Sequence, residues 1–283
     1  MEKYTAKELQ ALAQQFRIDV METLHEKGTG HWGGSSSVAE LLTCLYFDRM
    51  NIRPDQPGWE DRDRLILSKG HASPMLYAVL EKRGYIPAGS LKGFRELNSD
   101  LQGHPCMNKT PGVEMSTGAL GHGLSVGLGM SLMAERNENP FYTYVIVGEG
   151  CLNEGQSWEA IMAAAKFAPS RLVLLVDYNK VQLDGTSADI MPLDPLADKF
   201  RAFNWNVPSR SYNGHDVTSI RDSFEWLDQQ EGGPSVIIFD TTKGKGASFM
   251  ENDHKWHGAP IGDDHLAEAM PQLKTILAKW EDE

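Results

Sequence analysis

Two uninterrupted apolar runs flank an amphipathic segment in the middle of the chain. Thr143–Val147 and Leu172–Val176 are almost wholly apolar, which is typical of parallel strands buried on both faces. Between them, over about Gln156–Phe167, alanine and other apolar residues recur at helical spacing, with Asn153 as a suitable N-cap and Pro169 as a terminator. The pattern predicts a strand–helix–strand unit, and ligands of such units bind beyond the carboxyl ends of the strands.

Similar patterns recur along the rest of the chain. Further strands are predicted at Leu65–Leu67, Phe203–Val207 and Ser235–Thr241, and further helices at residues 5–27, 38–46, 72–84, 217–227 (with Asp216 as N-cap) and 263–280. Gly30–Ser37 is so rich in glycine that a loop is predicted there. Strands that alternate with helices predict an α/β fold, with a doubly wound, mostly parallel sheet and helices on both faces. We find no repeat or flexible linker, so residues 1–283 are predicted to form one domain.

Composition narrows the class of protein. The chain has 283 residues, 41% apolar and 23% charged, and a formal net charge of −12, which argues against a general nucleic-acid surface. Its three cysteines are dispersed, so we expect no disulfide framework and a reducing compartment. There is neither a signal-type apolar segment nor a stretch that approaches the roughly 18 apolar residues of a membrane span. These features predict a cytoplasmic protein that binds no membrane.

A carboxylate and an amide follow the two central strands. Glu149 lies in Gly148-Glu149-Gly150, directly after the first strand, and Asn179 follows the second strand 30 positions later. Because the carboxyl ends of parallel strands meet at one edge of a sheet, these side chains should converge. Their oxygens suit Mg²⁺, and glycine amides beside a helix N-terminus suit a diphosphate. A Gly-x-Gly sequence alone also fits an ordinary turn, so the prediction depends on the joint pattern.

Four of the nine histidines lie in glycine-flanked loops: His31, His71, His104 and His257. Glycine neighbours provide no packing wall, so we expect these side chains to face a site rather than the core. Imidazole has an ordinary pKa of about 6.5, so several in one pocket could exchange protons with hydroxyl groups or hydrogen-bond a polyol. Zinc is a weaker interpretation, because the paired ligand spacing of zinc sites is absent.

Three lysines closely follow predicted strands. Lys69 follows Leu65–Leu67, and Lys243 and Lys245 follow the strand that begins at Ser235. Lys243 and Lys245 could face phosphate, but solvated surface positions are the favoured prediction for all three lysines. Glycines recur every third or fourth residue in the second half of residues 111–129, which on a helix would let another element or a ligand approach the backbone.

The motifs carry a family resemblance. Residues 148–155, GEGCLNEG, with Asp177-Tyr178-Asn179 resemble the thiamine diphosphate motif, which opens Gly-Asp-Gly in that family, whereas this chain has Glu149. The wider chain resembles transketolase, whose GHPG, GH, GHP, TGPLGQG and HGAP segments occur here in the same order at Gly30-His31, Ser68–His71, Gly103–Pro105, Thr117–Gly123 and His257–Pro260. Trp32, Lys69 and His122 depart from the segments of single-chain transketolases.

The resemblance implies a role for each matching position. Glu149, Asn179 and the carbonyl of Val181 would bind Mg²⁺. The residues that would contact thiamine diphosphate are His71, Gly118, Ala119, Leu120, Gly150, Glu154, Asn179 and His257. His31, His104 and His257 would face the sugar as catalytic residues.

The resemblance also implies a partner, since a full-length transketolase is more than twice as long. We expect a second subunit that carries the pyrimidine-binding and carboxyl-terminal domains, in a heterotetramer with two copies of each chain. The activity would be transfer of a two-carbon ketol unit from a ketose to an aldose, on sugar or sugar-phosphate substrates. Two alternatives are an alpha subunit of a 2-oxoacid dehydrogenase and a non-catalytic cofactor-binding subunit, the latter supported only by Glu149.

Overall fold

A five-stranded parallel sheet forms the centre of the computed structural model, which describes residues 4–138 and 141–281. The strand order is β1-β2-β3-β5-β4, and every neighbouring pair is parallel. The strands are β1 (Arg64–Leu67), β2 (Thr143–Gly148), β3 (Leu172–Tyr178), β4 (Tyr212–Asn213) and β5 (Ser235–Asp240). The predicted α/β fold is thus confirmed. Residues 1–3, 139–140 and 282–283, which the single-domain prediction included, lie outside the described residues.

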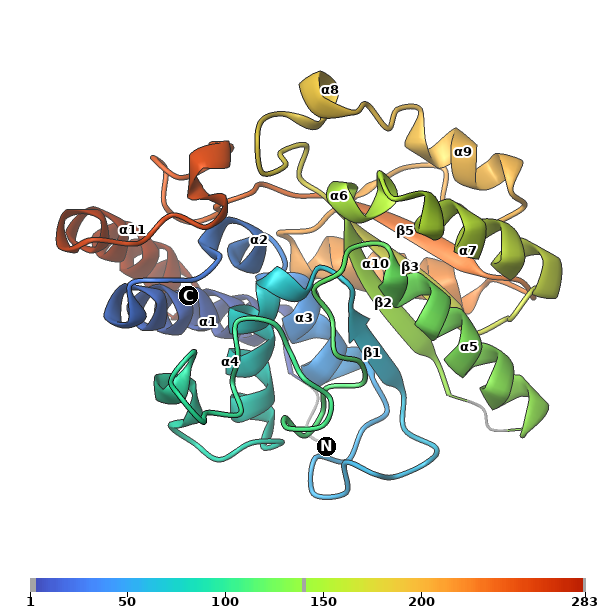
Figure 1. Cartoon of the computed structure of the whole chain (residues 1–283), viewed down its shortest axis with the longest axis horizontal. Helices are drawn as coiled ribbons and strands as arrows, with labels where there is room; N and C mark the ends of the chain where they lie inside the picture. The colour runs from blue at the N-terminus through green and yellow to red at the C-terminus, as the bar shows by residue number, and fades with distance from the viewer. Residues whose placement is uncertain (1–3, 139–140, 282–283) are drawn as a thin grey trace.

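Helices cover both faces of the sheet (Figure 1). The α-helices are α1 (Ala6–Lys27), α2 (Trp32–Ser36), α3 (Ala39–Cys44), α4 (Ser73–Arg83), α5 (His122–Arg136), α6 (Glu149–Leu152), α7 (Gly155–Phe167), α8 (Ser187–Ile190), α9 (Leu196–Ala202), α10 (Val217–Asp228) and α11 (Asp263–Glu281). Shorter π or 3₁₀ segments span Leu45–Arg49, Gly70–Ala72, Ser90–Gly93 and His254–His257. None of the described helices is both long and apolar enough to cross a bilayer.

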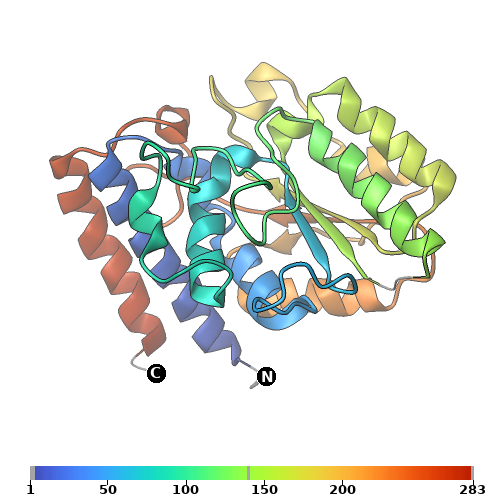
Figure 2. The ribbon, with the colours of Figure 1, turned by 60° about the horizontal axis from the view of Figure 1, so that its bottom comes forward.

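Apolar packing is divided between the two faces of the sheet. Alternate residues of β3 enter different clusters: Leu172, Leu174 and Val176 pack with α5 and α7, whereas Val173 and Leu175 pack with the helices of the other face. In Figure 2, α1, α4 and α11 lie on one side of the sheet and α5 and α7 on the other. Burial on both faces explains the uninterrupted apolar strands.

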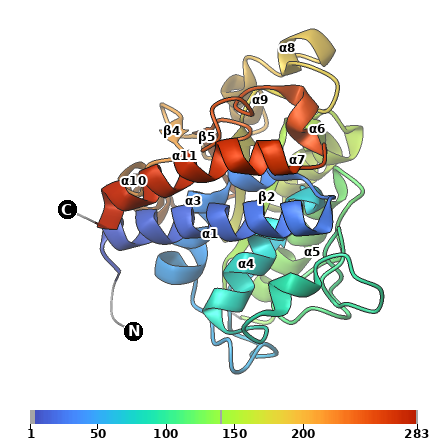
Figure 3. The same ribbon diagram turned by 90° about the vertical axis from the view of Figure 1, so that its left-hand side faces the viewer.

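The first and last helices lie side by side. Figure 3 shows α1 and α11 packed along their lengths, with the start of α1 and the end of α11 at the same end of the pair. Thr5 caps α1 through a capping box with Glu8, and Gly28 ends the helix with a φ of 61°. Ala269 and Leu273 of α11 are fully buried. The pairing brings the two ends of the sequence into one layer.

Two local predictions are wrong. Trp32–Ser36, predicted as a loop, forms helix α2, because all five residues are buried and packing outweighs the poor helix propensity of glycine. Phe203–Val207 is not a strand; in this segment Asn206 makes an isolated bridge to Ser235, and Trp205 turns inward to donate to the carbonyl of Ile161 at 3.0 Å.

The glycine turn and the helix cap also differ from expectation. Gly148 ends β2, and Glu149 begins the single turn of α6 rather than lying in a tight turn. The N-cap position of α7 is Glu154, not Asn153. Asn153 instead donates to the carbonyl of Met191 at 3.3 Å.

A buried ion pair joins α1 to α3. Arg17 contacts both carboxylate oxygens of Glu40, at 2.5 and 2.6 Å, and each side chain is 2% exposed. His215 donates through Nδ1 to the same carboxylate at 3.2 Å, because its Nε2 accepts from the backbone N–H of Thr242 at 2.7 Å. Burial would raise the pKa of Glu40, but Arg17 and His215 outweigh it and lower the value to about 2. The network fixes the segment that follows β5.

Two glycines of α5 should respond oppositely to alanine. A Cβ at Gly123 would lie 2.5 Å from the Cβ of Ser68 and 3.1 Å from its Cα, whereas one at Gly129 would meet open space. We expect Gly123→Ala to lower the free energy of unfolding by about 1–3 kcal/mol through overpacking. Gly129→Ala should raise it by about 0.5–1 kcal/mol through helix propensity. Urea denaturation of the two variants provides the test, and equal effects would contradict the packing of α5 on β1.

Candidate functional site

The carboxyl ends of the central strands open onto a cavity of about 280 Å³, here called the histidine pocket. Its lining residues are His31, Gly34, Lys69, His71, His104, Gly118, Leu120, Gly148, Glu149, Gly150, Asn179, Val181, Gln182, Leu183, Lys243 and His257. All the predicted site residues are among them except two. Ala119 is exposed between two lining residues, and Glu154 is exposed at the N-cap of α7. The pocket therefore unites segments from most of the chain.

Four imidazole rings form the core of this pocket. The ring of His31 lies with its centroid 5.5 Å from that of His71, 6.0 Å from that of His104 and 5.3 Å from that of His257. The rings of His71 and His257 are 4.9 Å apart. The four loop histidines therefore lie close together, as predicted.

Burial keeps these imidazoles neutral. Loss of hydration, followed by the charge of Arg95, lowers the pKa of His31 to about 4. Burial and Lys243 lower the pKa of His257 to about 3, and burial also lowers the pKa values of His71 and His104. At neutral pH the rings are therefore uncharged hydrogen-bond donors and acceptors. The buried Nδ1 of His31 has no protein partner among the described residues, which leaves it for a ligand.

Oxygen atoms from the start of α6 and from the loop after β3 face the same cavity. Glu149, which is 2% exposed, accepts a short hydrogen bond from the backbone N–H of Lys180. The side-chain oxygen of Asn179 accepts from the N–H of Val181 at 3.1 Å. Burial and the nearby Asp177 raise the pKa of Glu149 to about 7. A carboxylate and an amide oxygen thus converge, as the strand topology predicts.

Lys69 is buried, so its predicted surface position is wrong. It is 2% exposed and makes a short ion pair with Asp177, which is wholly buried. Asp177 also accepts from Ser37 at 2.7 Å and from the side-chain amide of Asn179 at 3.1 Å. Burial would raise the pKa of Asp177, but the Lys69 ammonium outweighs it and lowers the value. The Lys69–Asp177 pair therefore holds the side chain of Asn179 in place through this hydrogen bond.

Lys243 is also buried, at 3% exposed, whereas Lys245 lies nearer the surface and pairs with Glu251 at 3.4 Å. Burial, then the charge of Lys69, lowers the pKa of Lys243 to about 8, so it remains mostly a cation at neutral pH. A signal for both buried lysines was available, because each follows a predicted strand at the edge where the site was expected. Their acceptors, however, lie far along the chain.

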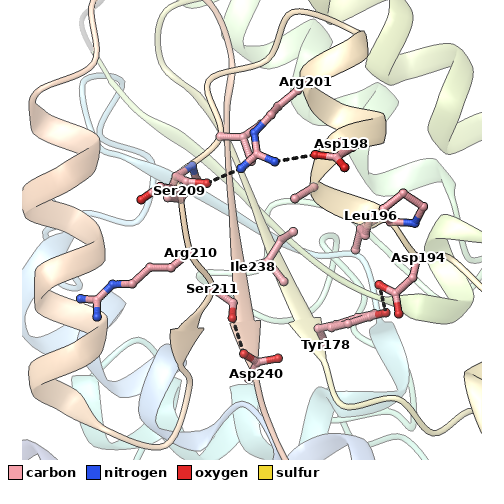
Figure 4. A pocket seen from close by; sticks show the side chains of 14 residues that line it. Tyr178, Asp194, Leu196, Asp198, Arg201, Ser209, Arg210, Ser211, Ile238 and Asp240 are labelled. Atoms are coloured by element: carbon pink, nitrogen blue, oxygen red, sulfur yellow. Dashed lines mark hydrogen bonds and ion pairs between the residues drawn. The ribbon is translucent and has the colours of Figure 1, made fainter.

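A second cavity, of about 310 Å³, lies between α9 and the ends of β3 and β5 (Figure 4). Three pairs of polar side chains form within it: Tyr178 donates to Asp194 at 2.8 Å, Arg201 binds Asp198 at 2.7 Å and Ser211 binds Asp240. None of the predicted site residues lines it. The histidine pocket is therefore the candidate site.

Comparison with known proteins identifies the family of this chain. Residues 8–276 match the family described as "Transketolase, thiamine diphosphate binding domain". The chain belongs to the transketolase family. One relative, the 6-deoxy-6-sulfo-D-fructose transketolase subunit SqwG of Clostridium sp. (strain MSTE9), is 41% identical over 94% of this chain and 96% of its own length. An apulose-4-phosphate transketolase subunit of Phocaeicola vulgatus is 38% identical over 97% of each chain.

Solved transketolase structures have the same fold. The transketolase from Leishmania mexicana superposes with a TM-score of 0.84 and 28% identity, over 99% of this chain and 47% of that protein. A Pichia stipitis transketolase gives a TM-score of 0.87 and 29% identity, over 98% of this chain and 41% of that protein. The chain therefore spans less than half of these transketolases.

The chemistry of the pocket fits the cofactor of the transketolase family. Hard oxygen donors (the Glu149 carboxylate, the Asn179 amide and the carbonyl of Val181) suit Mg²⁺, which also takes phosphate and water oxygens. Within the described residues there is no group of three or more His, Cys, Asp or Glu side chains able to hold a metal. The absence of a side chain at Gly34 leaves room for the ring of His71, since a Cβ at this position would lie 2.7 Å from Nε2 of His71.

Proposed function

We propose that this chain is the cofactor-binding subunit of a two-chain transketolase, which transfers a two-carbon ketol unit from a ketose to an aldose. The observation that carries this proposal is a single pocket in which four neutral imidazoles face an oxygen set suited to Mg²⁺. In support, relatives of nearly the same length are named as transketolase subunits, whereas the chain spans 42% of the Buchnera aphidicola transketolase. Its three free cysteines agree with a cytoplasmic location.

In this proposal Glu149, Asn179 and the carbonyl of Val181 bind Mg²⁺. The residues that contact thiamine diphosphate are His71, Gly118, Leu120, Gly150, Asn179 and His257. The contacts predicted for Ala119 and Glu154 stay predictions, since neither residue lines the pocket. When bound, thiamine diphosphate supplies the nucleophilic carbon that accepts and passes on the two-carbon unit.

The histidines orient the sugar and its protons. His31, His104 and His257 are the residues we assign to the substrate hydroxyl groups, and neutral imidazole rings can hydrogen-bond such groups. The unpartnered Nδ1 of His31 is free, among the described residues, to bond one hydroxyl. By their names, the two subunit relatives act on a sulfonated and on a phosphorylated ketose, so we propose a ketose with a terminal anionic group as the substrate class.

The partner is a second subunit that carries the pyrimidine-binding and carboxyl-terminal domains, with two copies of each chain in the assembly. We place its docking face on the outer surface of α5 and α7, which lie side by side (Figure 2). This docking face consists of Val126, Gly129, Met133, Met162 and Phe167. All five are exposed, and the two methionines and the phenylalanine are each more than half exposed.

Two features argue that the second subunit covers this docking face. Gly129 is an exposed glycine inside a helix, which costs about 1 kcal/mol and has no packing reason within the described part of the chain, since it faces open space. Close approach of another backbone supplies that reason. Both helices also begin near the histidine pocket, since α5 begins two residues after Leu120 and α7 begins five residues after Gly150.

The purified chain should show no ketol transfer alone and full transfer after it is combined with the second subunit. The assay uses a ketose phosphate and 6-deoxy-6-sulfo-D-fructose as donors, with thiamine diphosphate, Mg²⁺ and an aldose acceptor. Full turnover by the lone chain would sink the two-chain proposal. Decarboxylation of a 2-oxo acid by the pair, without ketose cleavage, would assign it to the 2-oxoacid dehydrogenases instead.

The docking face is tested in the same reconstitution. Met162→Asp and Met133→Asp should prevent co-elution with the second subunit, because each places a charge in a desolvated contact. Leu97→Asp, at a residue that is 92% exposed and belongs to neither α5 nor α7, is the matched control and should assemble normally. Normal assembly of both methionine variants would place the interface elsewhere.

A further inference from the structure

Lys243 has a fixed position inside the site. Its side chain passes over Gly33, where an added Cβ would lie 3.0 Å from the lysine Cγ and 3.1 Å from its Cε. The backbone on both sides is held, since Gly244 donates to the carbonyl of Gly33 at 3.1 Å and Asn252 donates to the carbonyl of Lys243 at 2.9 Å. Trp32 adds a hydrogen bond to the carbonyl of Gly244 at 3.3 Å. The ammonium therefore cannot swing freely, as surface lysines do.

The Lys243 ammonium has three acceptors at the same distance. Nζ lies 2.9 Å from the carbonyl oxygen of Val181, 2.9 Å from that of Gln182 and 2.9 Å from Nδ1 of His257. An ammonium has three N–H donors and no acceptor, so all its donors are used. One side chain thus ties the loop that carries a predicted metal ligand to a predicted sugar-facing histidine.

The contact with Lys243 also determines where the proton of His257 lies. Because an ammonium can only donate, Nδ1 must accept, and the proton of the neutral ring must be on Nε2. Nε2 is at the opposite edge of the ring, and His257 lines the pocket together with His31 and His71. The ring can then offer an N–H to a ligand oxygen, and it has no free lone pair with which to remove a proton.

We propose that Lys243 is a positioning residue that joins the Val181–Gln182 loop to His257 and fixes His257 as a neutral Nε2–H donor. The tautomer follows from the contacts alone, whereas its use on a sugar oxygen rests on the proposed function. In the reaction, this donor stabilises a substrate oxygen as negative charge develops there, and proton removal falls to the other imidazoles.

Imidazole nitrogen NMR on the ¹⁵N-labelled chain tests the tautomer without any assay of turnover. In the wild type, His257 should give the neutral Nε2–H pattern, with its signals assigned by their loss in His257→Asn. A wild-type Nδ1–H pattern would overturn the proposal, whether or not the protein is a transketolase. Lys243→Met should release the ring to a mixture of tautomers. Lys243→Gln, whose side chain has the length of methionine but carries an N–H donor, should retain Nε2–H.

The reconstituted enzyme tests the role. Lys243→Met should lower kcat on the order of 10- to 100-fold, as is typical when a supporting hydrogen bond to a site ligand is removed, with a smaller change in the KM of the ketose. Lys243→Gln should recover part of the loss, and Lys245→Met, two positions along the same loop, should match the wild type. A Lys243→Met enzyme with wild-type kcat and an unchanged His257 tautomer would refute the assignment. If the wild-type tautomer is as expected but the wild-type pair of subunits turns over no ketose, the proposed function fails and the tautomer assignment stands.

Discussion

Replacing Glu149 with alanine should abolish Mg²⁺-dependent binding of thiamine diphosphate by the assembled enzyme. Among the described residues, Glu149 is the only acidic side chain that lines the histidine pocket, and two buried lysines line it as well. Removal of the carboxylate leaves the metal with neutral oxygen donors next to cationic side chains, so we expect affinity to fall by more than about 100-fold. Isothermal titration calorimetry with the cofactor and Mg²⁺ measures the loss directly.

Glu149→Asp is the matched control, because the aspartate restores the residue of the thiamine diphosphate motif and keeps the charge. The extra methylene of Glu149 lets its carboxylate reach the backbone N–H of Lys180 in the loop after β3. The aspartate variant should lose that reach and still bind metal and cofactor. Wild-type affinity in Glu149→Ala would show that the oxygen set is wrongly assigned.

Glu40→Ala should lower the free energy of unfolding by about 3–5 kcal/mol, because it leaves the buried charge of Arg17 without its partner. Urea denaturation followed by linear extrapolation measures this loss. Since the pKa of Glu40 is lowered from 4.5 to about 2, the ionised carboxylate stabilises the folded state fully above about pH 4.5. Its contribution should disappear as the pH falls through about 2.

A surface ion pair supplies the comparison for Glu40. Arg201 and Asp198 are 2.7 Å apart, but their side chains are 44% and 68% exposed. Asp198→Ala should therefore change the free energy of unfolding by less than about 1 kcal/mol. If Glu40→Ala has an equally small effect, the Arg17–Glu40 pair does not stabilise the fold as its burial implies.

Elements with a strong local signal were predictable from the sequence. The strand–helix–strand unit around Glu149 is found as expected, because uninterrupted apolar runs are characteristic of strands buried on both faces. Asp216 caps α10 by accepting from the N–H of Thr218 at 2.9 Å, as predicted. The pocket itself was predictable for a similar reason: most of its residues follow a strand end or stand beside glycines.

Features that depend on distant partners were not predictable. Lys69 is buried because it forms an ion pair with Asp177, 108 positions away. Lys243 is buried because it donates to the carbonyl of Val181, 62 positions away. The strand end before each lysine indicates a position near the site, but no local pattern indicates that either side chain is buried. The loop predicted where α2 forms was wrong for the same reason, since the packing of Trp32 stabilises a segment whose glycines favour a loop.

The wide separation along the sequence of the segments that form the histidine pocket has a consequence for how the protein is made. His31 and His257 are neighbours in the pocket yet lie 226 positions apart in the sequence. On the ribosome, strands β1 to β3 can pair while the segments that carry Lys243 and His257 have not yet been synthesised. The nascent chain therefore completes its oxygen set before its imidazole cluster, and ribosome-stalled chains that end before residue 240 should fold a sheet without a finished site.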